Sequence, residues 1–296
     1  MSTMNRSLVI GATGNIGREV VLHLAANDHP VRALTRSRPN EVCMPPHVEV
    51  VQGDLTSPES LDGCLAGIDA VFLVWTAPLA AFAPALERIA KHVRRIVFLS
   101  APLKTPHPFF QQPNPSRAQT EQIEGMIETS GLDWTFLRPG MLASNSRNWW
   151  AKQILAGDVI RWPYLSVPTA PIDERDIAAV AVRVLYDERH FGAEYVLTGP
   201  QSLSQFEQIS TIGRAIGRTL SIQEIPPDEA QSELSATMPA FIVKMLLDAW
   251  SAGVGLPAFV TSTVAEITGT PARTFFDWAN DHAADFRRPR DEAQPL

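Results

Sequence analysis

Three glycines near the start of the chain have the spacing of a phosphate-binding turn. Gly11, Gly14 and Gly17 follow the apolar run from Ser7 to Ile10, and apolar residues at helical spacing come next. Glycine lets the backbone adopt positive φ and approach a ligand closely. The following helix directs free N–H groups and its positive dipole end at the turn, where a pyrophosphate fits. We therefore expect a pyrophosphate against Gly11, Thr13, Gly14, Asn15, Ile16 and Gly17.

The spacing is Gly-x-x-Gly-x-x-Gly, which differs from the usual Gly-x-Gly-x-x-Gly dinucleotide fingerprint. The alternative is a glycine-rich turn that only packs a helix against a strand. The preceding strand pattern and the following helix pattern favour the phosphate-binding interpretation.

The end of the next expected strand, residues 31–34, bears on the choice of cofactor. An NAD site usually has a carboxylate here to bond the ribose 2′-hydroxyl, whereas this chain has Thr35 followed by Arg36. A guanidinium can bind a 2′-phosphate in a bidentate manner. Arg36 therefore predicts that NADPH is preferred over NADH, the alternative being a solvated surface arginine.

Further residues at strand ends would lie along the cofactor, because ligands of open parallel sheets bind beyond the carboxyl ends of the strands. Asp54 is either an acceptor for the adenine amino group or a plain turn residue, and Trp75 is either a cofactor contact or a core residue. The expected contacts beyond the glycine turn and Arg36 are Asp54, Leu55, Val74, Trp75, Thr76, Ser100 and Pro139.

A group of large apolar side chains offers a candidate pocket for a flat aromatic ligand. Its members are Phe109, Phe110, Met141, Trp149, Trp150 and Trp162, and the alternative is that they are core. Trp149 and Trp150 are the more suggestive pair, because neighbouring helix positions cannot both face one core. His107 is a candidate proton donor and Ser100 a second catalytic candidate, although a loop histidine is more often merely solvated. No histidine spacing indicates a metal site.

Strand-like and helix-like segments alternate over the first half of the chain, which predicts a doubly wound parallel α/β sheet of the Rossmann type. We expect residues 1–150 to form the nucleotide-binding domain and residues 151–296 a smaller, mostly helical substrate-binding lobe, with about 170–200 returning to the sheet. Thr270-Pro271 is the expected start of the last helix.

Composition excludes several classes of protein. The 296 residues are 45% hydrophobic and 19% charged, as in a globular protein, and the net charge of −7 disfavours nucleic-acid binding. Cys43 and Cys64 make neither a disulfide framework nor a zinc site and predict reduced thiols in the cytoplasm. Pro78 and Pro84 interrupt the most apolar stretch, so we expect no membrane span. Monomer and homodimer both stay open.

Several of these motifs together resemble the NmrA-like group of atypical short-chain dehydrogenases/reductases. They are the glycine turn, the arginine after the second strand, Gly53-Asp54, the stretch from Ser130 to Gly140, Asp173-x-x-Asp176-Ile177-Ala178 and Leu197-Thr198-Gly199-Pro200. The resemblance covers nearly the whole chain. It implies an NAD(P)-binding fold and a function among quinone reductases, natural-product tailoring enzymes and redox sensors.

One departure limits the chemistry that we expect. Short-chain dehydrogenases generally use Tyr-x-x-x-Lys to donate a proton, but Pro168, His190 and Gly199 stand four residues after the three tyrosines. Reducing a ketone makes an alkoxide that needs an acid, whereas reducing a quinone makes a stabilised phenolate. We therefore expect an NADP(H)-dependent oxidoreductase acting on a quinone-like or polycyclic aromatic molecule. The alternative is a sensor that binds the dinucleotide without turnover.

Overall fold

Seven parallel strands form the central sheet of the computed structural model, which describes residues 6–102 and 104–288. The strand order is β3-β2-β1-β4-β5-β6-β9, which confirms the predicted doubly wound α/β fold. The strands are β1 (Ser7–Ile10), β2 (Val31–Thr35), β3 (Glu49–Gln52), β4 (Ala70–Leu73), β5 (Arg95–Leu99), β6 (Asp133–Pro139) and β9 (Ala193–Leu197). The order reverses between β1 and β4, so the ligand crevice of such folds lies at the carboxyl ends of these two strands.

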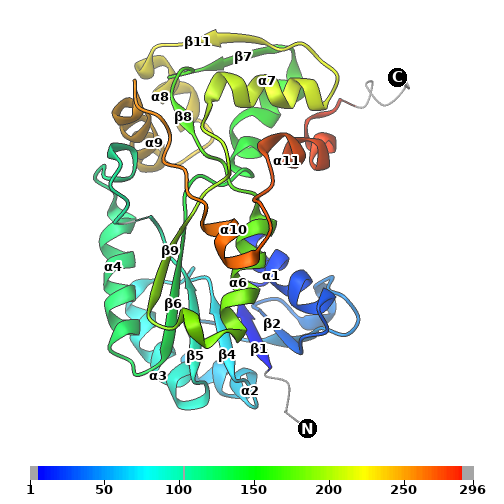
Figure 1. Cartoon of the computed structure of the whole chain (residues 1–296), viewed down its shortest axis with the longest axis vertical. Coiled ribbons are helices and arrows are strands. Elements are labelled where there is room, and N and C mark those ends of the chain that lie inside the picture. Colours follow the sequence, from blue (N-terminus) through cyan, green and yellow to red (C-terminus); the bar gives the residue numbers. More distant parts are fainter. Residues whose placement is uncertain (1–5, 103, 289–296) are drawn as a thin grey trace.

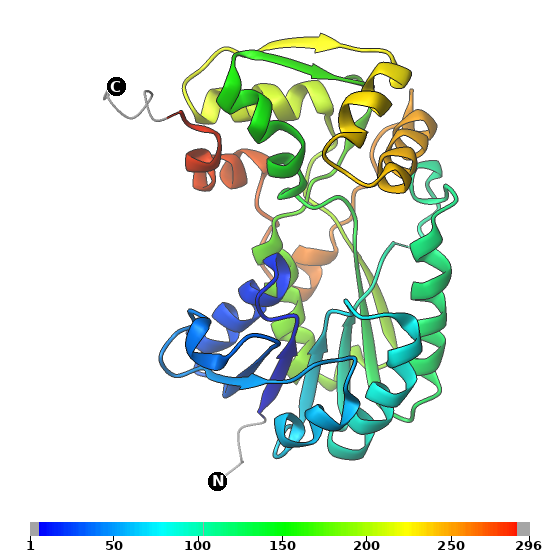
Figure 2. The same cartoon turned by 180° about the vertical axis from the view of Figure 1, so that it is seen from behind.

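Helices cover both faces of the sheet, as Figures 1 and 2 show. One face packs against α1 (Asn15–Ala26) and α6 (Glu174–Tyr186), and the other against α2 (Leu61–Leu65), α3 (Phe82–His92) and α4 (Pro115–Glu128). In β1, Val9 joins the first of these cores while Leu8 and Ile10 join the second. Burial on both faces explains the continuous apolar runs in the sequence.

A smaller lobe sits beyond the carboxyl ends of the strands (Figure 1). It contains the π-helix η5 (Arg147–Ala151), α5 (Lys152–Ala156), β7 (Val159–Trp162), β8 (Pro168–Thr169), β10 (Leu203–Ser204), α7 (Gln205–Ala215), β11 (Ser221–Glu224), α8 (Pro227–Ser235), α9 (Ala240–Gly253), α11 (Phe275–Asp281) and the short helix η7 (Ala283–Phe286). Between its two longest segments the chain returns to the sheet to form α6 and β9, and Leu137 of β6 pairs with Tyr195 of β9. The short helix α10 (Thr263–Thr268) packs against α6 and β9. The lobe is therefore woven from three segments of the chain.

Capping explains where two of the lobe's helices begin. Ser204 and Glu207 form a reciprocal capping box at the start of α7, and Thr274 and Asp277 form one at the start of α11. The predicted start of the last helix at Thr270-Pro271 is therefore wrong. Those residues lie in the loop after α10, which ends at Gly269 with a φ of +74°.

Four tryptophans fill the centre of the small lobe. Trp149, Trp150, Trp162 and Trp250 lie with neighbouring ring centroids 5.5–6.0 Å apart, mostly edge to face. Cys43 is exposed and Cys64 buried, and both are free thiols. Within residues 6–102 and 104–288, no helix has the length and apolar character that crossing a membrane requires.

Candidate functional site

The glycine turn after β1 is shaped to admit an anion. Gly11 has a φ of +87°, and a Cβ on Gly17 would lie 2.1 Å from the carbonyl oxygen of Gly11. Gly14 is the N-cap of α1, and no side chain caps the helix or places an acidic group in its first turn. Thr13, Gly14 and Asn15 are exposed. The N–H groups of the first turn therefore face solvent without an acceptor from a capping side chain, as a bound pyrophosphate requires.

The end of β2 presents two arginines beside this turn. Thr35 is buried and its hydroxyl accepts a hydrogen bond from the Ser37 N–H at 3.1 Å, whereas Arg36 and Arg38 are exposed. Within the part of the chain that the structure describes, neither guanidinium has a hydrogen-bond or ion-pair partner. A free guanidinium at this position fits a 2′-phosphate.

After β3, Asp54 forms hydrogen bonds within its own loop, which the sequence did not indicate. One carboxylate oxygen of Asp54 accepts hydrogen bonds from the backbone and the hydroxyl of Thr56, both at 2.8 Å. These bonds, with a smaller contribution from Arg36, lower the pKa of Asp54 below its usual value. Leu55 is buried in the core beneath. Asp54 thus has one oxygen left for an adenine amino group.

The end of β4 supports the turn from the other side. A Cβ on Gly11 would lie 2.8 Å from the Cβ of Val74, so Val74 packs directly under the turn. Trp75 meets the ring of Phe82 edge to face at 4.8 Å and packs against the core, while Thr76 is exposed. Val74 and Thr76 therefore flank the crevice, and Trp75 serves mainly as its wall.

A buried charge network, which the sequence patterns did not predict, stands behind the ends of β5 and β6. The Ser100 hydroxyl donates to Glu124 of α4 at 2.6 Å, and Arg138 of β6 donates to both oxygens of Glu124 at 3.0 and 2.7 Å. Arg138 also donates to Glu194 of β9 at 2.5 Å, and Lys104 donates to the other Glu194 oxygen at 2.8 Å. The signal that could have revealed the network is a charged residue inside the apolar run of β6, because a buried arginine needs a partner.

This network fixes the charge states of its members. Burial alone would lower the pKa of Arg138, but its hydrogen bonds to Glu124 and Glu194 outweigh burial and raise it. Burial alone would raise the pKa of Glu194, but the hydrogen bonds from Lys104 and Arg138 outweigh burial and lower it. Because the Ser100 proton points at a carboxylate, Ser100 presents lone pairs rather than a proton to the site.

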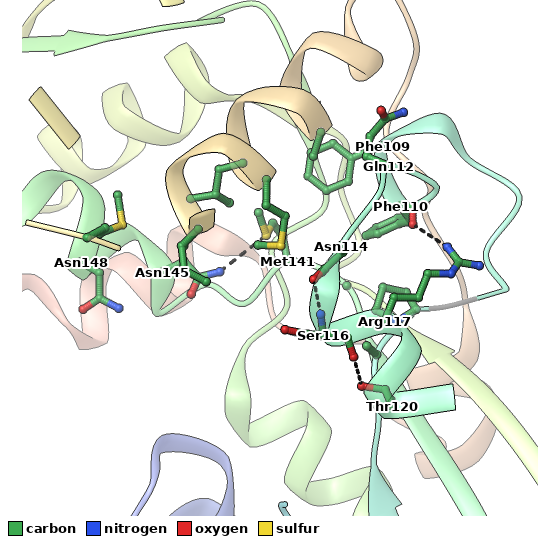
Figure 3. A pocket seen from close by; sticks show the side chains of 18 of the residues that line it. Phe109, Phe110, Gln112, Asn114, Ser116, Arg117, Thr120, Met141, Asn145 and Asn148 are labelled. Atoms are coloured by element: carbon green, nitrogen blue, oxygen red, sulfur yellow. Dashed lines mark hydrogen bonds between the residues drawn. The ribbon is translucent and has the colours of Figure 1, made fainter. Parts of the chain in front are cut away.

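A cavity of about 400 Å³, here called the central pocket, opens beside these strand ends (Figure 3). Ala101, Pro102, Gly140 and Met141, which follow β5 and β6, form its floor. The start of α4, helix α9 and the residue Met238 before α9 form its sides. The lining residues from these elements are Asn114, Ser116, Arg117, Thr120, Met238, Ile242, Met245, Leu246 and Ala249. The α9 side chains could not be assigned from the sequence, because nothing local to them indicates which element they face.

The predicted substrate-binding residues divide between this pocket and the core. Phe109, Phe110, Met141 and Trp149 line the central pocket. Trp150 has no exposed surface and Trp162 is 1% exposed, so the structure places both in the tryptophan core rather than in this pocket. Trp149 and Trp150 share one core, so the prediction that they cannot both face the same core was wrong. They lie in the wide turn of a π-helix, and both rings join the same cluster.

His107 is not placed to donate a proton. Its Nδ1 accepts from the Phe109 N–H at 3.2 Å, which leaves Nε2 as the donor to the Pro257 carbonyl at 2.9 Å. Both ring nitrogens are therefore engaged, and His107 lies outside the lining of the central pocket. It ties the loop before α4 to the segment after α9. Pro139 is buried at the end of β6 and meets the site only through its neighbour Gly140.

The comparison with known proteins decides the family. A family model described as NAD(P)H-binding matches residues 11–188, which contain the glycine turn and most of the sheet. The chain belongs to this NAD(P)H-binding family. It is an NAD(P)H-dependent oxidoreductase, as predicted from the sequence, and the reductases among its relatives agree with this assignment.

Two relatives match over nearly the full length. The (4-alkanoyl-5-oxo-2,5-dihydrofuran-3-yl)methyl phosphate reductase of Streptomyces griseus is 37% identical, over 94% of this chain and 98% of the relative. The NAD(P)H azoreductase of Xenophilus azovorans is 31% identical, over 94% of this chain and 98% of the relative. The structure of NmrA, a negative transcriptional regulator, aligns with a TM-score of 0.75 at 19% identity and covers 99% of both chains. At that identity the likeness concerns the fold, and the predicted NAD(P)-binding fold is confirmed.

Proposed function

We propose that this protein uses NADPH to reduce a quinone-like or other conjugated small molecule held in the central pocket. The observation that carries the proposal is the position of this pocket, which opens directly beside Ala101 and Gly140 at the ends of β5 and β6. A flat ring can lie there between Phe110 and Met141 on one side and α9 on the other. A sensor would need no such open apolar pocket beside the strand ends.

The residues at the nucleotide end fit NADPH. The uncapped first turn of α1 would hold the pyrophosphate, and Gly17 keeps that turn free of side-chain atoms. Arg36, exposed and without a partner in the described part of the chain, would bind the 2′-phosphate. When bound, the reduced nicotinamide supplies a hydride.

The central pocket orients the substrate and does not donate a proton to it. The Ser100 proton is engaged by Glu124, and both nitrogens of His107 are engaged by the backbone. A quinone needs little help of this kind, because its reduced form is a stabilised phenolate that takes a proton from water. Orientation of the ring over the pocket floor then provides most of the rate.

The relatives act on substrates of compatible chemistry. The name of the Streptomyces griseus reductase describes a ring double bond that carries an alkanoyl group and a ring carbonyl. The Xenophilus azovorans enzyme is named for azo compounds. Both names describe electron-poor conjugated acceptors, which supports a substrate of this class for the present chain.

NADPH oxidation with 2-methyl-1,4-naphthoquinone tests the proposal, followed at 340 nm with NADH as the comparison. We expect turnover with NADPH in the wild type and a loss of at least tenfold in kcat/KM for Met245→Trp, which fills the central pocket. Met245→Leu preserves the volume and serves as the control. No oxidation of NADPH by this quinone or by a panel of conjugated acceptors would remove the proposed reaction.

A further inference from the structure

A second cavity, here called the outer cavity, adjoins the central pocket. Its volume is about 390 Å³, and Lys152, Trp162, Ile225, Leu234 and Thr237 are among its lining residues. Asn148 and Trp149 line both cavities. On the opposite side, Thr237 lines the outer cavity and its neighbour Met238 lines the central pocket. The two spaces therefore share one wall, made by these side chains.

The wall is built on the π-helix η5. A π-helix has a wider turn than an α-helix, is rare, and occurs frequently at functional sites. Here it holds Trp149 edge to face with Trp250 at 5.5 Å and tilted against Trp162 at 6.0 Å. Figure 3 shows Asn148 at the end of the central pocket opposite Arg117. The outer cavity therefore lies next to the Asn148 end of the central pocket, along the same aromatic wall.

The charges around the outer cavity leave one cation available. Arg161 is paired with Glu229 and Glu233, and Gln153 exchanges hydrogen bonds of 2.8 and 3.2 Å with the backbone of Arg161. Lys152 is exposed and has no hydrogen-bond or ion-pair partner in residues 6–102 and 104–288. An unpaired ammonium beside an aromatic wall suits an anionic group carried on an aromatic molecule.

We propose that the outer cavity is a distal subsite for long, flat substrates that carry an anionic group at the end remote from the reduced bond. The conjugated part lies in the central pocket, the molecule passes Asn148 and Trp149, and the anion meets Lys152. This inference rests on the proposed function, because it extends the same substrate site. It makes Lys152 a specificity-determining residue.

Binding of a matched pair of dyes tests the subsite. The probes are 4-[4-(dimethylamino)phenylazo]benzoate and its neutral benzamide, titrated into the full-length protein with and without NADP⁺. We expect Lys152→Gln to weaken the benzoate dye about three- to tenfold, as for a partly exposed ion pair, without weakening the benzamide. Lys91→Gln, a substitution of another exposed lysine, on α3, is the matched control and leaves both affinities unchanged.

A second variant tests the cavity apart from the charge. Thr237 is exposed, so Thr237→Phe is tolerated by the fold and fills the outer cavity. We expect it to weaken both dyes, whereas N,N-dimethylaniline, which matches only the part of the dyes placed in the central pocket, keeps its affinity. Equal affinity of the benzoate dye for wild type and Lys152→Gln, or failure of both dyes to bind, overturns the subsite. Quinone turnover is measured in a separate assay. If turnover is absent, the proposed reaction is refuted, but the dye-binding test of the subsite is unaffected.

Discussion

Glu124 holds the buried charge network together, and its replacement by alanine gives the sharpest stability prediction. Its side chain is 5% exposed and accepts three hydrogen bonds, one from Ser100 and two from Arg138. Removing one member of a buried ion pair typically costs 3–5 kcal/mol, because the other charge stays buried. Arg138 keeps Glu194 as a partner. We therefore expect Glu124→Ala to lower the free energy of unfolding by about 3 kcal/mol.

Urea unfolding followed by tryptophan fluorescence measures this loss. Glu87→Ala is the control, because Glu87 makes an exposed pair with Lys91 and its removal should leave the midpoint unchanged. Adding Arg138→Met to Glu124→Ala removes the stranded charge, so the double variant should lose less than the sum of the two single variants. A loss below about 1 kcal/mol for Glu124→Ala, or simple additivity, would refute the argument that the network is a coupled buried unit.

Three further predictions concern the cofactor turn, the cofactor phosphate and the proton. Gly17→Ala should destabilise the protein by about 1–3 kcal/mol, since its Cβ would lie 2.1 Å from a backbone oxygen. Gly125→Ala is the control and should stabilise the protein, because a Cβ there would stand in open space on α4. Equal effects of the two substitutions in urea unfolding would contradict the close packing at Gly17. Arg36→Ala should weaken NADPH about tenfold by calorimetry and leave NADH unchanged, as expected for one exposed charged hydrogen bond; unchanged NADPH affinity would remove the 2′-phosphate assignment. The pH profile of quinone reduction should show no limb near the ordinary pKa of histidine; a limb there that disappears in His107→Gln would restore His107 as the proton donor.

Local patterns predicted the scaffold, and they supply the residues that we propose for the nucleotide end of the site. Each of these patterns lies within a short stretch of sequence: the glycine turn, the arginine after β2 and the alternation of strands with helices. They can therefore be interpreted without knowing which distant segments contact them. The start of the last helix was misplaced because Thr270-Pro271 and Thr274-x-x-Asp277 are both plausible N-termini, and the reciprocal cap at Thr274 prevails.

The central pocket depends on contacts between distant segments, and the sequence indicated only part of its lining. Phe109, Phe110, Met141 and Trp149 reach the central pocket, but its opposite wall comes from α9, which carries no motif. The π-helix places the rings of Trp149 and Trp150 in the same core, which the residue spacing of an α-helix does not predict. The two partners of His107, the Phe109 N–H and the Pro257 carbonyl, become visible only in the fold.

NADPH binding to Gly14→Asp tests most directly whether the cofactor lies on the first turn of α1. Gly14 is the N-cap of α1 with a φ of −83° and a ψ of 169°, a conformation in which aspartate is a favoured cap. The variant should therefore be at least as stable as the wild type, yet its carboxylate would occupy the mouth where we propose that the pyrophosphate binds. The account predicts calorimetric binding of NADPH to the wild type and none to a folded Gly14→Asp. Equal NADPH affinity in the two proteins would contradict it.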